Sequence, residues 1–66
     1  MTIGKLIEGL QLLASCEEKG LDAYCVAAEH DTLYAGPVLS KVPDEIGKKL
    51  EALGWHKDDD SWAAFT

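Results

Sequence analysis

The chain has 66 residues, of which twelve are acidic and six are basic, and all six basic residues are lysines. The resulting net charge of −6 disfavours direct binding to DNA, RNA or anionic membranes, and it favours protein partners with basic surfaces. Because 47% of the residues are hydrophobic, the composition suffices for a single core, and we expect one folded domain over residues 1–66.

The sequence gives no sign of export or membrane insertion. The first apolar stretch is interrupted by Glu8, which a secretory signal peptide would tolerate poorly, and no stretch approaches the ~20 apolar residues of a membrane helix. We therefore expect a cytoplasmic protein. In that compartment Cys16 and Cys25 are expected to be free thiols, although the sequence leaves a bridge between them open.

The first predicted element is an amphipathic helix over residues 2–19. Thr2 suits the N-cap, and Gly20 suits a left-handed residue that ends the helix. The apolar residues recur at three- and four-residue steps and predict one buried stripe, made of Ile3, Leu6, Ile7, Leu10, Leu13 and Ala14.

Two antiparallel strands are predicted next. Residues 21–28 are apolar on both faces, including Tyr24, which indicates a central strand. A polar turn at 29–31 leads to a second strand at 32–35, and such a short connection requires antiparallel pairing.

A second helix is predicted over residues 43–53. Pro43 suits its first position, and Gly54 suits its end. The expected buried stripe consists of Ile46, Leu50 and Leu53.

The C-terminal residues predict a hairpin with arms at 55–57 and 61–65 and a turn at 58–60. Trp55 and Trp62 would then face each other across the hairpin and help to close the core. The order α-β-β-α-β-β predicts an α+β fold, with helices packed on one antiparallel sheet.

No residue pattern indicates catalysis or a cofactor. The spacing of Cys16, Cys25, His30 and His56 matches no zinc module, and the run 58–60 lacks the alternating ligands of a calcium loop. Cys25 is expected inside a strand and buried, and a buried thiol is a poor nucleophile; the sequence also has no glycine-rich phosphate loop. We expect a protein that is not an enzyme and has no metal or cofactor.

Several carboxylates lie where they cost local stability. Glu17 and Glu18 fall at the end of the first predicted helix, where the helix dipole disfavours negative charge by ~0.3–1 kcal/mol each, and Asp22 follows closely. Three adjacent aspartates repel one another at 58–60. Such placement suggests selection for binding, and clustered carboxylates can imitate the charge of a nucleic-acid backbone. The group Glu17, Glu18 and Asp22 and the turn with Glu29 and Asp31 would lie roughly 20 Å apart, at opposite ends of the first strand.

The opening MTIGKLIEGLQ and the ending LGWHKDDDSWAAFT resemble small phage and prophage proteins, and in size and layout the chain is most similar to the type I-C anti-CRISPR proteins. The resemblance implies a monomeric inhibitor, acting in the cytoplasm of a bacterial host. It would bind the large, PAM-reading subunit of the Cascade complex and block target DNA by mimicry. The contact residues would be Glu17, Glu18, Asp22, Glu29 and Asp31, with Asp58, Asp59 and Asp60 as an alternative cluster.

A second interpretation stays open. A phage structural or adaptor protein, or a regulator of a host enzyme, would bind its partner through an apolar patch around Trp55, Trp62 or Tyr34. Salt would weaken the first kind of binding strongly and the second kind little.

Overall fold

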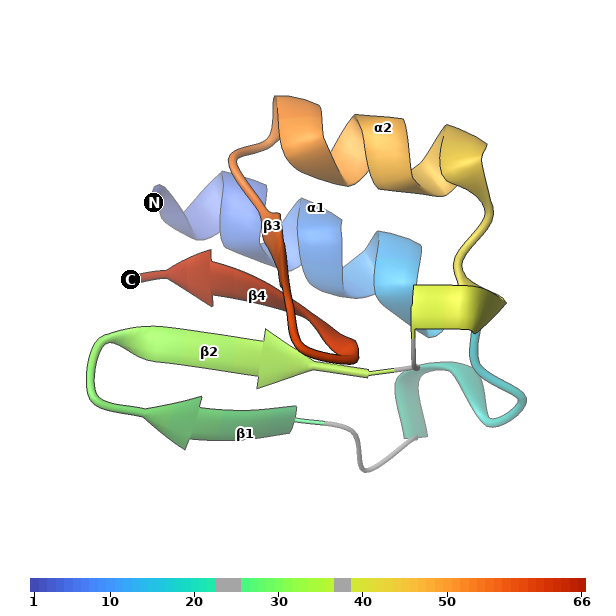
Figure 1. Ribbon diagram of the computed structural model, residues 1–66, viewed down its shortest axis with the longest axis horizontal. Helices are drawn as coiled ribbons and strands as arrows, with labels where there is room; N and C mark the ends of the chain where they lie inside the picture. The colour runs from blue at the N-terminus through green and yellow to red at the C-terminus, as the bar shows by residue number, and fades with distance from the viewer. Residues whose placement is uncertain (23–25, 37–38) are drawn as a thin grey trace.

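Two α-helices lie on one face of a four-stranded antiparallel sheet in the computed structural model of the protein (Figure 1). The structure describes residues 1–22, 26–36 and 39–66. The elements are α1 (Ile3–Ala14), η1 (Gly20–Asp22), β1 (Val26–Glu29), β2 (Thr32–Ala35), η2 (Leu39–Lys41), α2 (Asp44–Ala52), β3 (His56–Asp58) and β4 (Ser61–Phe65), where η1 and η2 are single 3-10 turns. The predicted α+β fold is confirmed, and so is the order of its helices and strands.

Helix α1 begins as predicted and ends five residues early. The Thr2 hydroxyl caps it by accepting a hydrogen bond from the Lys5 N–H at 3.2 Å. After Ala14 the chain changes to backbone hydrogen bonds that join residues three apart instead of four; one of them runs from the Glu17 N–H to the Ala14 carbonyl at 3.0 Å. Such bonds form turns and do not continue the α-helix. Gly20 has the predicted positive φ of +58°, but it begins η1 and does not end α1.

The buried stripe of α1 is narrower than predicted. Gly9 and Leu13 are buried, and Leu6 and Leu10 pack beside them against the core. Ile3 and Ile7, which we expected in the core, are 78% and 49% exposed. The buried positions lie three and four residues apart on one face, and the two isoleucines lie along its flank, beyond the contact with α2 and the sheet.

The first strand is shorter than predicted and lies at the edge of the sheet. Residues 20–22 form η1, the strand begins at Val26, and the predictions for residues 23–25, including Tyr24 and Cys25, fall outside the described residues. The sheet order is β1-β2-β4-β3, so among the described strands β1 pairs with β2 alone, and the prediction of a central strand is wrong. The antiparallel pairing and the bounds of β2 are confirmed.

The C-terminal hairpin forms with a two-residue turn, Asp59-Asp60. This turn pairs Lys57 with Trp62, and Trp55 comes before β3 begins. The predicted pairing of Trp55 with Trp62 across the hairpin is therefore wrong. In its place the Lys57 ammonium lies 5.7 Å from the centre of the Trp62 ring.

Both tryptophans nevertheless belong to the core, as expected. Trp55 is 2% exposed and Trp62 is 1% exposed. They pack with Leu13 and Leu50 in one cluster, and Ile46 and Leu53 of the predicted α2 stripe lie against it. Pro43 is the N-cap of α2 rather than its first residue, and Gly54 follows the helix with a φ of +99°.

The two termini lie at the same end of the molecule (Figure 1). The C-terminal residue is tied to the β1–β2 turn, because the Thr66 N–H and hydroxyl both donate to the Asp31 carbonyl oxygen, at 2.8 Å and 3.0 Å. These bonds hold the end of β4 against the turn that carries Glu29 and Asp31.

Candidate protein-binding surface

The face of the sheet opposite the core carries aromatic and acidic side chains together. Side chains alternate between the faces of a strand, and Trp62 and Ala64 of β4 point into the core, so Ser61, Ala63 and Phe65 lie on the other face. The strand register extends this second face, which we call the open face, across all four strands. It consists of Ala27, Glu29, Thr32, Tyr34, His56, Asp58, Ser61, Ala63 and Phe65.

Three aromatic side chains lie on the open face, namely Tyr34, His56 and Phe65. His56 and Phe65 stack with their ring centres 4.5 Å apart and their planes at 27°. Ala63, which pairs with Tyr34 on one side and with His56 on the other, is fully buried although it points away from the core. Phe65 itself remains 61% exposed, so part of its ring is open to a partner.

Tyr34 connects this aromatic group to the carboxylates. Its hydroxyl donates a hydrogen bond to Asp58 Oδ2 at 3.2 Å, reaching across β4 to do so. That hydrogen bond is the main reason why the pKa of Tyr34 is raised above its usual value, and burial and the negative charges of Asp58, Glu29 and Asp59 add to it. Carboxylates of both hairpins therefore act on the Tyr34 hydroxyl, which lies on the open face.

The structure divides the predicted contact residues between two ends of the sheet. Glu29 ends β1 and Asp31 lies in the following turn, beside the Phe65 end of β4. Asp58, Asp59 and Asp60 lie at the opposite end, where β4 begins. The remaining predicted contact residues, Glu17, Glu18 and Asp22, lie in the turns after α1 and in η1, toward the end from which β1 starts (Figure 1).

The predicted spacing of the acidic groups relied on an eight-residue strand. The described β1 has four residues and spans about 13 Å, from ~3.3 Å per residue. In the structure, the acidic ends of the sheet are the β1–β2 turn and the Asp59-Asp60 turn. Of the eight predicted residues, only Glu29 and Asp58 lie on the open face itself.

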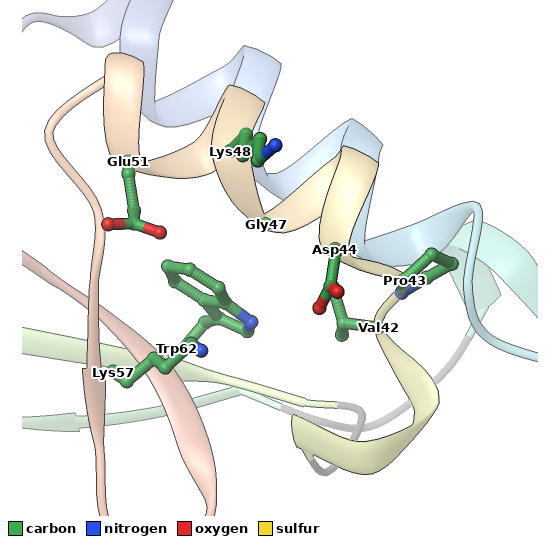
Figure 2. A pocket seen from close by; sticks show the side chains of 8 residues that line it. All are labelled: Val42, Pro43, Asp44, Gly47, Lys48, Glu51, Lys57 and Trp62. Carbon is green, nitrogen blue, oxygen red and sulfur yellow. The ribbon is translucent and has the colours of Figure 1, made fainter.

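A separate cavity of about 190 Å³ lies between α2 and the C-terminal hairpin (Figure 2). Its lining includes Asp44, Glu51, Lys48 and Lys57, two acids and two bases, and in Figure 2 the indole nitrogen of Trp62 lies on the side of its ring nearer Asp44. This buried N–H has no hydrogen-bond partner among the described residues. The charges of these two acids and two bases cancel in the lining of the cavity.

The described residues do not assemble a metal centre. Within residues 1–22, 26–36 and 39–66, no three histidine, cysteine, aspartate or glutamate side chains lie close enough together to hold a metal ion. Cys16 is a half-buried free thiol, whose Sγ donates to the Leu12 carbonyl at 3.7 Å, and His56 is engaged with Phe65.

Sequence reasoning missed the exposed apolar side chains. It placed the apolar contact surface around Trp55, Trp62 or Tyr34. The two tryptophans are buried and Tyr34 is half-buried, whereas Ile3, Ile7, Leu21 and Phe65 are exposed. The signal for the α1 pair was present, because the apolar positions of that helix cover more than one narrow stripe. The signal for Phe65 was the alternation of β4, which puts Phe65 on the face opposite Trp62.

No protein family, curated protein or solved structure matches this chain. Of the helices that the structure describes, none has the length and apolar character needed to cross a membrane.

Proposed function

We propose that the protein inhibits a nucleic-acid-binding protein by placing carboxylates in the basic groove that its nucleic acid would occupy. The observation that supports this most is the position of the acids on both hairpins of one sheet: Glu29 and Asp31 at one end, and Asp58, Asp59 and Asp60 at the other. A rigid sheet keeps these charges at fixed separations, as a nucleic-acid backbone keeps its phosphates.

The resemblance to type I-C anti-CRISPR proteins extends this proposal to a particular partner. That partner is the large, PAM-reading subunit of the Cascade complex in a bacterial cytoplasm, and the consequence of binding is loss of target-DNA recognition. The inhibitor acts as a monomer, without catalysis and without a cofactor. Its net charge of −6 also accelerates its encounter with a basic groove at low salt.

A competition assay tests the proposal. Labelled target DNA is bound to purified type I-C Cascade, and the protein is added at low and at high salt. We expect the protein to displace the DNA at low salt and to lose its own affinity steeply as salt rises. Failure to bind Cascade would contradict the assignment of this partner. Binding that survives charge reversal at all eight predicted acids would contradict the proposal of nucleic-acid mimicry.

One observation favours a second candidate, an adaptor or regulator that binds through apolar contacts. Ile3 and Ile7 are 78% and 49% exposed on the flank of α1, where they contribute little to the core. Binding of this kind would be insensitive to salt, and it would be lost in an Ile3→Ser, Ile7→Ser double variant that leaves the carboxylates in place.

A further inference from the structure

We propose that the open face is the surface that receives the partner, and that it does so by holding an arginine side chain between Phe65 and Glu29. The inference rests on the proposed function and deepens it, because it selects one surface among the acidic groups and one kind of partner residue. It follows from the register of the sheet, the exposure of Phe65 and the charges around Tyr34.

Phe65 offers the aromatic part of the site. Its ring is 61% exposed, and its stack with His56, at 4.5 Å between centres, fixes its orientation without burying it. A guanidinium group is planar and weakly hydrated, so it stacks on such a ring and is attracted by the ring's negative face.

Glu29 offers the charged part. It pairs with Thr32, and Thr32 in turn pairs with Phe65, so these three residues form one row across β1, β2 and β4. The α-carbons of Glu29 and Phe65 are separated by two strand spacings, about 10 Å. Thr32 between them has a short side chain, and a guanidinium lying over it can stack on Phe65 while its N–H groups point to the Glu29 carboxylate.

The surrounding charges favour a cation on this face and oppose a nucleic acid. Asp58 receives the Tyr34 hydrogen bond, and the negative charges of Asp58, Glu29 and Asp59 all contribute to the raised pKa of Tyr34. A phosphate backbone would meet the same charges as repulsion. Other four-stranded sheets use exposed aromatic rings to stack nucleic-acid bases, but the acids here make a basic protein segment the complementary partner.

Arginine fits the row better than lysine does. The guanidinium can form two parallel hydrogen bonds with one carboxylate while its plane lies on an aromatic ring, whereas an ammonium group is a compact and strongly hydrated point charge. The open face should therefore distinguish the two side chains, which a purely electrostatic surface would not do.

A nuclear magnetic resonance titration of the nitrogen-15-labelled full chain tests the inference. The probes are a short capped arginine-glycine peptide and the matching lysine-glycine peptide of equal length and charge. We expect the arginine peptide to bind more tightly and to shift the amide signals of Glu29, Thr32 and Phe65 most. Equal affinity for the two peptides, or shifts confined to the Asp59-Asp60 turn and to residues 17–22, would overturn it.

Variants sharpen the test. Phe65→Ala should weaken binding of the arginine peptide by roughly two- to fivefold. Phe65→Tyr keeps an aromatic ring and should bind the peptide as the native protein does. Ile3→Ala removes another exposed apolar side chain, on α1, and should change nothing. Since Phe65 is largely exposed, these variants are expected to fold, and an unchanged affinity in Phe65→Ala would contradict the proposal.

The failure of this inference and the failure of the proposed function are distinguishable. If charge reversal of the acids abolishes competition with DNA but Phe65→Ala leaves it unchanged, mimicry stands and the open face is not its contact surface. If the arginine peptide binds the open face but the protein never competes with DNA, the arginine site stands and its partner is a different basic protein.

Discussion

The indole of Trp55 lies directly against Gly9 of α1. A methyl group at Gly9 would stand 2.0 Å from Nε1 and 2.3 Å from Cε2 of that ring, and the same N–H donates to the Lys5 carbonyl at 3.4 Å. Gly47 of α2 has a looser version of this relationship with Trp62, at 3.2 Å from Cζ2. In each of the two helices, a glycine therefore leaves room for the ring of a tryptophan from the C-terminal segment.

Gly9→Ala should destabilise the protein by about 1–3 kcal/mol, because the added methyl group overpacks the Trp55 contact and outweighs the gain in helix propensity. Gly4→Ala is the matched control on the same helix, since nothing lies within 4 Å of its methyl position. We expect that variant to gain up to about 1 kcal/mol. Urea unfolding followed by tryptophan fluorescence measures both, and equal effects would contradict the close contact.

Asp58→Asn should lower the pKa of Tyr34, because it weakens the hydrogen bond to a carboxylate that is the main cause of the raised pKa and also removes the negative charge of Asp58. The ultraviolet absorbance of tyrosinate reports the titration, and Tyr34→Phe distinguishes this tyrosine from Tyr24. Asp60→Asn is the control: it removes a neighbouring charge that is not among those raising the pKa of Tyr34, and it should leave the titration curve in place.

The raised pKa of Tyr34 also makes the stability of the folded protein depend on pH. The pKa of Tyr34 in the folded state lies above its ordinary value of 10.0, so the folded state holds this proton more tightly than the unfolded state does. Its contribution is therefore fully present below pH 10 and is lost as the pH rises through the folded pKa. Alkaline unfolding of the Tyr34→Phe variant should lack this component.

His30→Val should destabilise the β1–β2 hairpin by about 1–2 kcal/mol, because His30 has a φ of +56°, which is costly for a β-branched residue. His30→Asn should be nearly neutral, since asparagine tolerates this conformation. His30 is exposed, so neither variant changes the core. Equal thermal stabilities of the two variants would show that this turn relaxes to another conformation.

The two acidic hairpin turns can be ranked by charge removal in the DNA-competition assay. A Glu29→Gln, Asp31→Asn variant should lose more inhibition than an Asp59→Asn, Asp60→Asn variant, because Glu29 lies in the same row of the open face as Phe65. Both variants remove two charges and keep the side-chain shapes. A larger loss from the second pair would place the contact at the Asp59-Asp60 turn.

Local patterns predicted the elements whose signals were local. The cap at Thr2, the bounds of β2 and the buried stripe of α2 followed from single residues and their spacing. The end of α1 and the edge position of β1 did not, because they depend on hydrogen bonds beyond Ala14 and on which strand neighbours β4. The residues of the open face could not be predicted from the sequence either, because they depend on the register of β2 with β4.

Side chains of strand β4 alternate between the two faces of the sheet: Trp62 and Ala64 are in the core cluster, and Ala63 and Phe65 lie on the open face. Substitutions at Phe65 can therefore change what the surface recognises without touching the core. A one-residue slip of β4 against β2 would instead exchange the two faces of the strand. In evolution or in engineering, the composition of the open face can therefore vary only while the register between β2 and β4 is kept.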